Sequence, residues 1–263
     1  MLRLGGTASV SHMEVFEGLA EILRRQGIEF DWVLYSGYDA LVEAFVSGEI
    51  DLAWNGPLSY LKIKRRVSDP CRVIAMRDVD VNFTTCFITQ AGSTIATVED
   101  LKDTRFAFGG RDSVEAGVLA YHFLKQVGID PRSDLAEFTF HDERPPGHAS
   151  GEMDVMARVL DGEYDAGAVS GATLETVQRD EPSQGAKVRV LWSSPGYSHC
   201  CFTAQGEMDA ELSDRLTEAL LSIEYSDDLG KKVLDGEGCT SFVRGIDEGW
   251  ETLEVVAEEE GLI

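Results

Sequence analysis

The chain has 263 residues, enough to bury one large hydrophobic core or two of moderate size. Hydrophobic residues make up 43% and charged residues 27%, which is ordinary for a soluble globular protein. The charge balance is unusual, because 47 Asp and Glu face 23 Lys and Arg and give a formal net charge of −24. A field of that sign argues against nucleic acids and anionic membrane surfaces as partners. A strongly solvated surface, as in salt-adapted organisms, would have the same composition.

Neither a signal peptide nor a membrane span is predicted, so no membrane insertion is expected. The first apolar strand begins at once with Leu2 and Leu4, and no stretch approaches the ~20 apolar residues that cross a bilayer. The cysteines form no CxxC pair, which favours free thiols in a reducing compartment and no metal site. They are Cys71, Cys86, Cys200, Cys201 and Cys239. Taken literally, the chain is cytoplasmic; a protein trimmed of its leader would be periplasmic or extracytoplasmic.

The first third of the chain alternates short apolar runs with segments of helical periodicity. Strands are predicted at Leu2–Gly5, Phe30–Leu34 and Arg72–Met76. Helices are predicted at Met13–Gln26, Tyr38–Ser47 and Leu58–Val67. A small polar loop that contains Thr7 follows the first strand.

Two segments of the chain follow the same pattern. In Val42–Leu61 a helix ends at Gly48, and a Gly-Glu-x-Asp sequence leads into a short strand and a polar loop. The pattern returns in Met156–Glu175, where Gly162 follows Gly48 by 162 − 48 = 114 residues. The repeat predicts two similar α/β lobes, each with a loop at the carboxyl end of a strand, where ligands of open α/β sheets bind.

Two β-rich runs, Val81–Gln90 and His199–Ala204, are interpreted as the segments that pass between the lobes. Strands between them are predicted at Phe106–Phe108, Glu137–His141 and Tyr164–Val169, and a helix at Ser113–Val127 with Asp112 as its cap. Only helices are predicted after the second run, at Ala210–Ile223, Asp227–Leu234 and Asp247–Glu259. The order predicts an α/β protein with a discontinuous first lobe, residues 1–85 and 200–263, around a second lobe of residues 86–199. Such lobes can close on a ligand cleft by a hinge.

The order and spacing of several motifs resemble those of a known family. The motifs are GYDALVEAFVSGEIDLAWNGPLSYL, TVEDLKD with FAFGGRDS and VGIDP, GEYDAGAV, and VRVLWSSPGYSH. Together they are similar to the phosphate, phosphite and phosphonate solute-binding proteins of ABC transporters, which have the type 2 periplasmic-binding-protein fold. The resemblance covers nearly the whole chain. It implies a small-molecule ligand, an ABC-transporter permease as partner and no cofactor.

The resemblance also implies a set of ligand-binding residues. Tyr38 and Asn55 would line the first lobe's wall, with Thr7 in the loop after the first strand. Members of the family that bind phosphonates carry Ser-Thr-Ser-Gly at a helix start, where backbone amides and hydroxyls hold the anion. This chain instead has Ser113 with Glu115 beside it. The remaining expected contacts are Thr84, Thr85, His148, Ser170 and Thr173.

Each of these residues also has a purely structural interpretation. Tyr38 and Asn55 could be helix-start and turn residues, Thr84 and Thr85 strand formers, and His148 an exposed loop residue. Glu115 follows Asp112 at the spacing of a capping box. If Glu115 faces the cleft instead, its charge and the missing hydroxyls outweigh the helix dipole, and tight phosphonate binding should be absent. A ligand bearing an amine or hydroxyl groups would then be preferred.

The leading hypothesis is therefore a protein that closes two lobes around a small polar solute, a binder rather than an enzyme. The sequence contains no HExxH, GxSxG or P-loop motif. The alternative is a cytoplasmic enzyme or ligand sensor on the same fold, as in menaquinone or thiamine-precursor pathways. In an enzyme, His12 or His148 would be the acid–base candidate.

Overall fold

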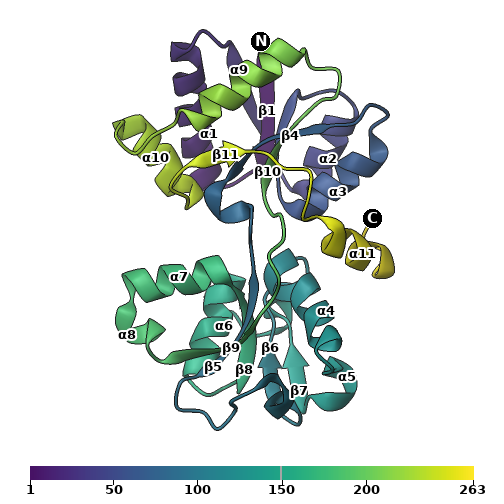
Figure 1. Cartoon of the computed structure of the whole chain (residues 1–263), viewed down its shortest axis with the longest axis vertical. Coiled ribbons are helices and arrows are strands. Elements are labelled where there is room, and N and C mark those ends of the chain that lie inside the picture. The colour runs from purple at the N-terminus through teal and green to yellow at the C-terminus, as the bar shows by residue number, and fades with distance from the viewer. Residues whose placement is uncertain (149) are drawn as a thin grey trace. The chain divides into compact units, whose positions relative to one another are not determined.

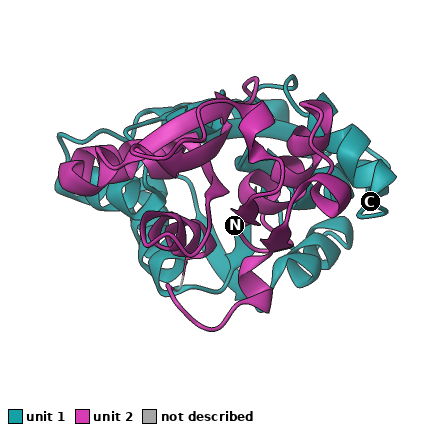
Figure 2. Cartoon of the chain, turned by 90° about the horizontal axis from the view of Figure 1, so that it is seen from below, with its two compact units in different colours: residues 1–82, 197–263 teal, residues 83–196 magenta. Residues whose placement is uncertain are grey.

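The computed structural model describes residues 1–148 and 150–263 (Figure 1). The chain divides into two compact units, coloured separately in Figure 2. Unit 1 comprises Met1–Asn82 and Tyr197–Ile263, and unit 2 comprises Phe83–Gly196. No helix within the described residues combines the length and the apolar character that a membrane crossing requires.

Unit 1 is built on a six-stranded sheet with the order β11-β4-β10-β3-β1-β2. Strands β2, β1 and β3 are parallel to one another, whereas β10 runs antiparallel to both β3 and β4. The strands are β1 (Leu2–Thr7), β2 (Phe30–Tyr35), β3 (Leu52–Asn55), β4 (Arg72–Arg77), β10 (Cys201–Ala204) and β11 (Phe242–Arg244). The helices are α1 (Val10–Arg25), α2 (Tyr38–Val46), α3 (Pro57–Arg66), the 3-10 turn Asp78–Asp80, α9 (Ala210–Leu221), α10 (Asp228–Glu237) and α11 (Glu251–Glu259).

The apolar residues of unit 1 form two clusters, one on each face of this sheet. Leu52 and Trp54 belong to the cluster that also contains the buried residues of α1, α9 and α10. Ala53, between them in β3, belongs to the cluster with α2 and α3. Successive residues of a strand point to opposite faces, so the short run Leu52–Trp54 supplies both cores.

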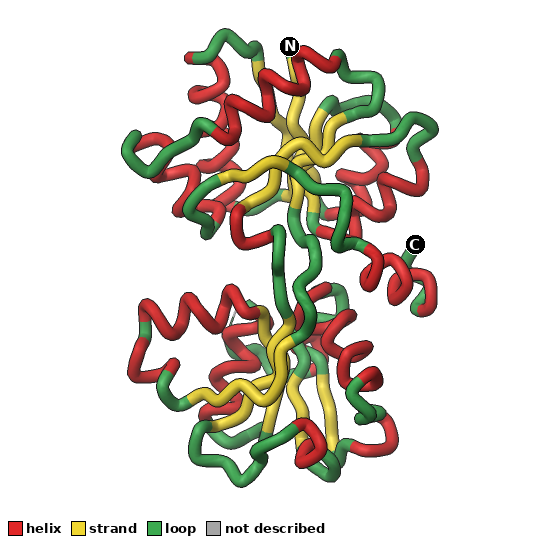
Figure 3. Tube along the Cα trace, in the orientation of Figure 1, coloured by secondary structure: helices red, strands yellow, loops and turns green. Residues whose placement is uncertain are grey.

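Unit 2 is built on a five-stranded sheet with the order β7-β6-β8-β5-β9. The helices of each unit lie on both sides of its sheet (Figure 3). The strands are β5 (Thr85–Gln90), β6 (Arg105–Ala107), β7 (Glu137–Thr139), β8 (Ala166–Ser170) and β9 (Val188–Ser193). The helices are α4 (Leu119–Gln126), α5 (Pro131–Asp134), α6 (Gly151–Leu160), α7 (Gly171–Asp180) and α8 (Pro182–Gly185), with a π-helical segment at Val114–Val118 and 3-10 turns at Val98–Leu101 and His141–Glu143.

The two sheets have the same strand pattern. In unit 2, β7, β6 and β8 are parallel, and β5 runs antiparallel to both β8 and β9. These relations match those of β2, β1, β3, β10 and β4 in unit 1, to which β11 adds one edge strand. Each unit is therefore a version of one α/β design.

The predicted sequence repeat occupies equivalent places in this design. Gly48 and Gly162 end α2 and α6 in the left-handed region, with φ of 73° and 75°. Asp51 then accepts a hydrogen bond from the backbone N–H of Arg3 at 2.8 Å, and Asp165 accepts one from the backbone N–H of Arg105 at 2.8 Å. Each Asp thus joins the start of one strand to the neighbouring parallel strand. The repeat prediction is confirmed at the level of individual hydrogen bonds.

Three local predictions are wrong. The helix expected at Ser113–Val127 is capped by Ser113, not Asp112, and begins with the π-helical turn Val114–Val118. The region after β10 is not purely helical, because Phe242–Arg244 pairs with β4 as β11. Three residues are too few to show a strand period in the sequence. The β-rich run expected from Val81 forms a strand only from Thr85 onward.

Candidate ligand-binding sites

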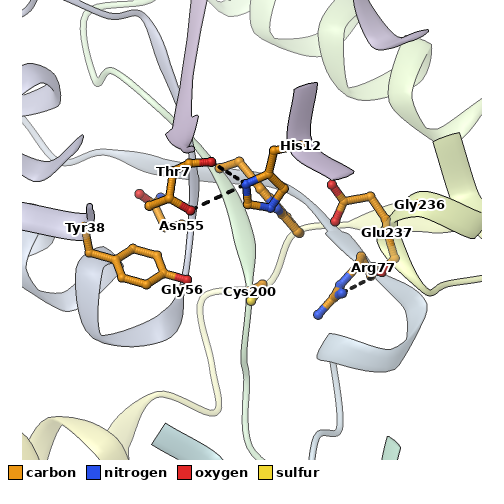
Figure 4. Close-up of a pocket in the computed structure, with 10 residues that line it drawn as sticks. Thr7, His12, Tyr38, Asn55, Gly56, Arg77, Cys200, Gly236 and Glu237 are labelled. Atoms are coloured by element: carbon orange, nitrogen blue, oxygen red, sulfur yellow. Dashed lines mark hydrogen bonds between the residues drawn. The ribbon is translucent and has the colours of Figure 1, made fainter. Parts of the chain in front are cut away.

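Unit 1 contains a pocket of about 160 Å³ at one end of its parallel strands (Figure 4). Three of the predicted ligand residues, Thr7, Tyr38 and Asn55, line this pocket together. The other lining residues are His12, Trp54, Gly56, Arg77, Cys200, Gly236 and Glu237. Tyr38 and Asn55 lie on one side, and Arg77 and Glu237 on the other (Figure 4).

Strand geometry explains why residues distant in sequence meet here. Thr7 ends β1 and Asn55 ends β3, and these strands are parallel neighbours, so both side chains reach the same edge of the sheet. Tyr38 begins α2 and is 50% exposed. A Cβ atom at Gly56 would lie 3.5 Å from the ring of Tyr38, so the glycine brings the chain after β3 close to that ring.

His12 is held in place by the loop that precedes α1. Its Nδ1 lies 2.6 Å from the carbonyl oxygen of Thr7. A carbonyl only accepts hydrogen bonds, so Nδ1 carries the hydrogen. The ring stacks on Phe16 at a centroid distance of 5.6 Å, and Ser9 caps the helix by accepting from the backbone N–H of His12 at 3.0 Å. These contacts fix the orientation of the imidazole beside the pocket.

An ion-pair network adjoins the pocket, and two of its members, Arg77 and Cys200, line it. Arg77 donates to both carboxylate oxygens of Asp80, at 2.5 and 2.9 Å, and to the carbonyl oxygen of Glu237 at 2.6 Å. His199 Nδ1 lies 3.1 Å from Asp80, and Cys200 Sγ lies 3.2 Å from the same nitrogen. Burial acts to raise the pKa of Asp80, but the hydrogen bonds from Arg77 and His199 lower it below its ordinary value.

Asp80, His199 and Cys200 have the spacing of three metal ligands, with their ligand atoms within 4.8 Å of one another. However, Arg77 already neutralises Asp80 and engages both of its oxygens. A metal ion there would face the guanidinium charge. The cluster is therefore explained by the ion pair without a metal.

Glu237 contributes a buried carboxylate at the end of α10. It is 5% exposed, and burial raises its pKa to about 7, although the charge of Arg77 lowers that pKa and the charge of Asp80 raises it further. Its burial could not be predicted from the sequence, because nothing local distinguishes this glutamate from the exposed acidic residues of the same helix.

A second polar group forms in unit 2 at the start of β5 and the end of β8. Thr85 lies opposite Ser170 across these strands, and its hydroxyl donates to the carbonyl oxygen of Glu115 at 2.7 Å. Thr84 lies beside the start of α7, where its carbonyl oxygen accepts from the N–H of Gly171 at 2.9 Å. Ser170 caps α7 by accepting from the backbone N–H of Thr173 at 3.0 Å. The structure thus brings six predicted residues together here: Thr84, Thr85, Ser113, Glu115, Ser170 and Thr173.

The donors at the start of α7 already hold a carboxylate of the protein itself. Glu152 accepts a hydrogen bond from the backbone N–H of Ser170, one from the Ser170 hydroxyl at 3.2 Å, and one from the Thr173 hydroxyl at 2.6 Å. Desolvation raises the pKa of Glu152, and the nearby charge of Glu115 raises it further, while these hydrogen bonds lower it. Glu152 thus occupies the position that a bound anion would take at this helix start.

Glu115 also engages a predicted ligand donor. The Ser113 hydroxyl donates to the Glu115 carboxylate at 2.8 Å and accepts from the backbone N–H of Ala116 at 3.3 Å. This arrangement replaces the expected capping box with Asp112. The hydroxyl of Ser113 is therefore committed to a carboxylate within its own turn.

The remaining predicted residue, His148, is exposed in the loop between Glu143 and α6. It does not line the unit 1 pocket, and none of the hydrogen bonds described above involves it. The functional candidates that sequence reasoning missed are Arg77, Glu152 and Glu237. The sequence shows a basic residue at the end of β4, but neither its ion-pair partner nor the pocket that it lines can be predicted from the sequence.

Two units of one α/β design, each with a polar group at one edge of its sheet, have the architecture of the periplasmic binding proteins. The sequence model of the protein family described as "ABC transporter, phosphonate, periplasmic substrate-binding protein" matches residues 7–250 of this chain. The chain belongs to that family. The predicted two-lobed periplasmic-binding-protein fold class is thereby confirmed, and so is the predicted family.

Individual relatives agree with this assignment. A probable ABC transporter phosphite-binding protein, PhnD1 of Prochlorococcus marinus (strain MIT 9301), is 24% identical over 250 residues, covering 91% of this chain and 81% of the relative. The structure of PhnD1 in complex with methylphosphonate has a TM-score of 0.74 at 22% identity, with 100% of this chain and 98% of that chain covered. A binding-protein component of an ABC phosphonate transporter from Pseudomonas aeruginosa has a TM-score of 0.67 at 15% identity, covering 99% and 86%.

Proposed function

We propose that this protein is the substrate-binding component of an ABC importer, which binds a small polar solute and delivers it to a membrane permease. The observation that carries the proposal is the family match over residues 7–250. A family of transport proteins favours a binder over the enzyme and sensor alternatives. The family's description also supports a site of action outside the cytoplasmic membrane.

The proposed binding residues are the polar groups of both units. Thr7, Tyr38 and Asn55 line the unit 1 pocket. In unit 2, Thr84 and Thr85 lie at the start of β5, Ser170 ends β8, and Ser113 caps the helical segment Val114–Val118. Loops and helix starts at the carboxyl ends of strands are where ligands of open α/β sheets bind, which supports this assignment.

Unit 2 differs from a simple anion cradle. Backbone N–H groups at a helix start favour negative charge by about 0.3–1 kcal/mol per exposed charge. Here Glu152 already accepts from the start of α7, and Glu115 accepts from Ser113. A charge-assisted hydrogen bond is worth about 1.5–3 kcal/mol, so the loss of these donors to internal carboxylates outweighs the dipole. We therefore propose that this protein binds simple phosphonates more weakly than a family member whose helix-start hydroxyls are free.

The solute-binding function is tested by thermal unfolding of the full chain with methylphosphonate, phosphite, phosphate, small carboxylates and small amines. A solute that binds the folded state raises the free energy of unfolding by RT ln(1 + [L]/Kd), about 2.7 kcal/mol at 100 times Kd, and thereby raises the unfolding temperature. At least one compound class should produce a concentration-dependent rise. The absence of any rise across the whole panel would contradict the proposed function.

The phosphonate expectation is tested by titration calorimetry at low salt. We expect methylphosphonate to bind the unmodified protein more weakly than about 1 µM. Glu115→Ser should tighten binding about tenfold, because it removes a repulsive charge and supplies a hydroxyl. Glu137→Ser removes an exposed charge from β7 of the same unit and serves as the control. Sub-micromolar affinity in the unmodified protein would show that the internal carboxylates do not oppose the anion.

A further inference from the structure

Two short segments of the chain connect the units, because the chain leaves unit 1 after residue 82 and re-enters it at residue 197. Within unit 1, the backbone N–H of His199 donates to the carbonyl oxygen of Asp80 at 3.0 Å. Within unit 2, the backbone N–H of Ser194 donates to the carbonyl oxygen of Thr85 at 2.9 Å. Between these two hydrogen-bonded pairs lie the crossing segments, residues 81–84 and 195–198.

The pair in unit 1 is buried and doubly connected. Asp80 is 0% exposed and His199 8%. Besides the main-chain bond, the ring nitrogen Nδ1 of His199 lies 3.1 Å from the carboxylate of Asp80, and both oxygens of that carboxylate accept from Arg77. The two crossing segments are therefore joined to each other where they enter unit 1.

The second crossing segment is also held by the loop between β11 and α11. The backbone N–H of Ser198 donates to the carbonyl oxygen of Gly249 at 2.9 Å, and its hydroxyl donates to the carbonyl oxygen of Glu248 at 2.6 Å. Ser198 is 1% exposed, so both bonds are shielded from water. We call Glu248 and Gly249 the clasp.

The clasp has the backbone conformation and the anchor that this contact requires. Gly249 has a φ of 84°, and a Cβ atom there would lie 2.7 Å from Oγ and 3.0 Å from the backbone nitrogen of Ser198. Both distances are well inside van der Waals contact, so only glycine fits. The next residue, Trp250, is 1% exposed, and its ring centroid lies 4.4 Å from that of Tyr60 on α3. This packing anchors the clasp to α3.

We propose that the clasp fixes the unit 1 end of a hinge, so that the units move relative to each other only by bending of residues 81–84 and 195–197. A hinge motion is absorbed by a few loop residues that change φ and ψ. Residues held by buried hydrogen bonds absorb such a change only if those bonds break, which requires local unfolding. Glu248 and Gly249 are not among the residues that line the unit 1 pocket. The inference therefore does not depend on which solute the protein binds.

Amide hydrogen exchange of the full chain, followed by NMR, tests which residues are held. In the unmodified protein, the protection factor of Ser198 should be at least 100 times that of Gly196, which lies between the two pairs. Gly249→Ala should speed exchange at Ser198 at least tenfold relative to Phe202 in β10, whose amide reports global unfolding. Gly92→Ala, where a Cβ would have no neighbour within 4 Å, is the control and should change this ratio less than twofold.

The distribution of distances between the units tests the hinge itself. Ketone-bearing amino acids at Glu17 on α1 and Glu137 on β7, both exposed, carry nitroxide labels and leave the native cysteines unlabelled. In double electron–electron resonance without solute, Gly249→Ala should broaden the distribution at least 1.5-fold. Ser198→Ala is a milder variant, because it removes one of the two bonds to the clasp, and it should broaden the distribution in the same direction. Gly92→Ala should leave it unchanged.

Each outcome bears on the inference. An unchanged distance distribution in a folded variant whose Ser198 exchange has accelerated would overturn it, because the clasp would then stabilise unit 1 without limiting the hinge. A protection factor at Ser198 no higher than that at Gly196 in the unmodified protein would also overturn it. If Gly249→Ala does not fold, Ser198→Ala and the unmodified protein decide. These measurements use no solute, so their failure leaves the proposed function to the thermal-unfolding panel.

Discussion

The buried charged residues of this protein differ in whether all their side-chain oxygens have hydrogen-bond partners. Asp154 in α6 is 1% exposed and accepts hydrogen bonds from Arg144 at 2.9 Å and Arg158 at 3.0 Å. Removing one partner of such a pair leaves an uncompensated buried charge, which costs about 3–5 kcal/mol. Glu237 differs, because one of its oxygens has no partner. A buried polar atom without a hydrogen-bond partner reduces stability, and titratable residues with a perturbed pKa cluster at functional sites.

Glu237 predicts how stability depends on pH. Burial raises its pKa from 4.5 to about 7 in the folded protein. The folded state therefore holds a proton that the unfolded state has lost, so the free energy of unfolding falls as pH rises from about 4.5 through 7, by about 3 kcal/mol in all. The groups facing it are His12 on α1, Arg77 on β4, Asp80 with its lowered pKa, and Cys239, whose pKa burial raises to about 12.

Glu237→Gln should remove this component of the pH dependence. Relative to the unmodified protein, the variant should gain stability progressively between pH 5 and pH 8, measured by urea unfolding at each pH. Glu17→Gln, an exposed residue on α1, should show no such trend. A stability difference between Glu237→Gln and the unmodified protein that is the same at every pH would contradict the assignment.

At the level of elements, the chain uses one connection twice. A helix ends at a left-handed glycine, and an Asp three residues later accepts from the backbone N–H of an Arg on the adjacent parallel strand. The next strand then ends in a polar residue at the start of another helix, Asn55 before α3 and Ser170 in front of α7. The same local chemistry therefore places a polar side chain at the same edge of both sheets.

Alanine substitution of the two glycines tests this equivalence. Gly48→Ala and Gly162→Ala should each reduce the free energy of unfolding by about 1–2 kcal/mol, because a Cβ atom makes the left-handed backbone conformation sterically unfavourable. A Cβ at Gly48 would have no neighbour within 4 Å, and one at Gly162 only an ordinary 3.6 Å contact, so the backbone alone carries the effect. Gly92→Ala, where φ is not positive and no atom lies within 4 Å, is the control and should change stability by less than about 0.5 kcal/mol. A neutral result at Gly48 would show that its left-handed conformation is not needed.

For the molecule as a whole, net charge is the dominant property. A formal charge of −24 repels itself in the compact state and keeps the protein soluble. Many of the ion pairs are exposed, such as Arg24 with Glu21 and Arg244 with Glu218, and such pairs contribute little. Screening should therefore relieve more repulsion than it removes attraction.

Salt should accordingly stabilise this protein. Between about 0.15 M and 1 M salt the screening length falls from about 8 Å to 3 Å. We expect the unfolding temperature in calorimetry to rise by several degrees over that range in NaCl. The rise should shrink at pH 5, where protonation of carboxylates has begun to reduce the net charge. A fall in unfolding temperature with added salt would mean that the ion pairs outweigh the repulsion.

The sequence by itself determined what depends on neighbours along the chain. Gly48 and Gly162 revealed the repeat because a helix end and the following turn are made from consecutive residues. The order of motifs identified the family and hence the fold class, and it placed Thr7, Tyr38 and Asn55 among the proposed ligand residues. The local sequence pattern predicts a helix start less reliably where two residues that can cap a helix are adjacent. Here Ser113 caps the helix, and the predicted Asp112 does not.

Only the tertiary structure decided which charges meet. Glu152 accepts a hydrogen bond from the backbone N–H of Ser170, although 18 residues separate the two. Arg77 donates to the main-chain carbonyl oxygen of Glu237, 160 residues further along the chain. Strand β11 forms because β4 offers an edge to pair with, which its own three residues do not signal. The Glu237 oxygen without a hydrogen-bond donor has the same origin, since burial and pairing are properties of the packed fold and not of local sequence.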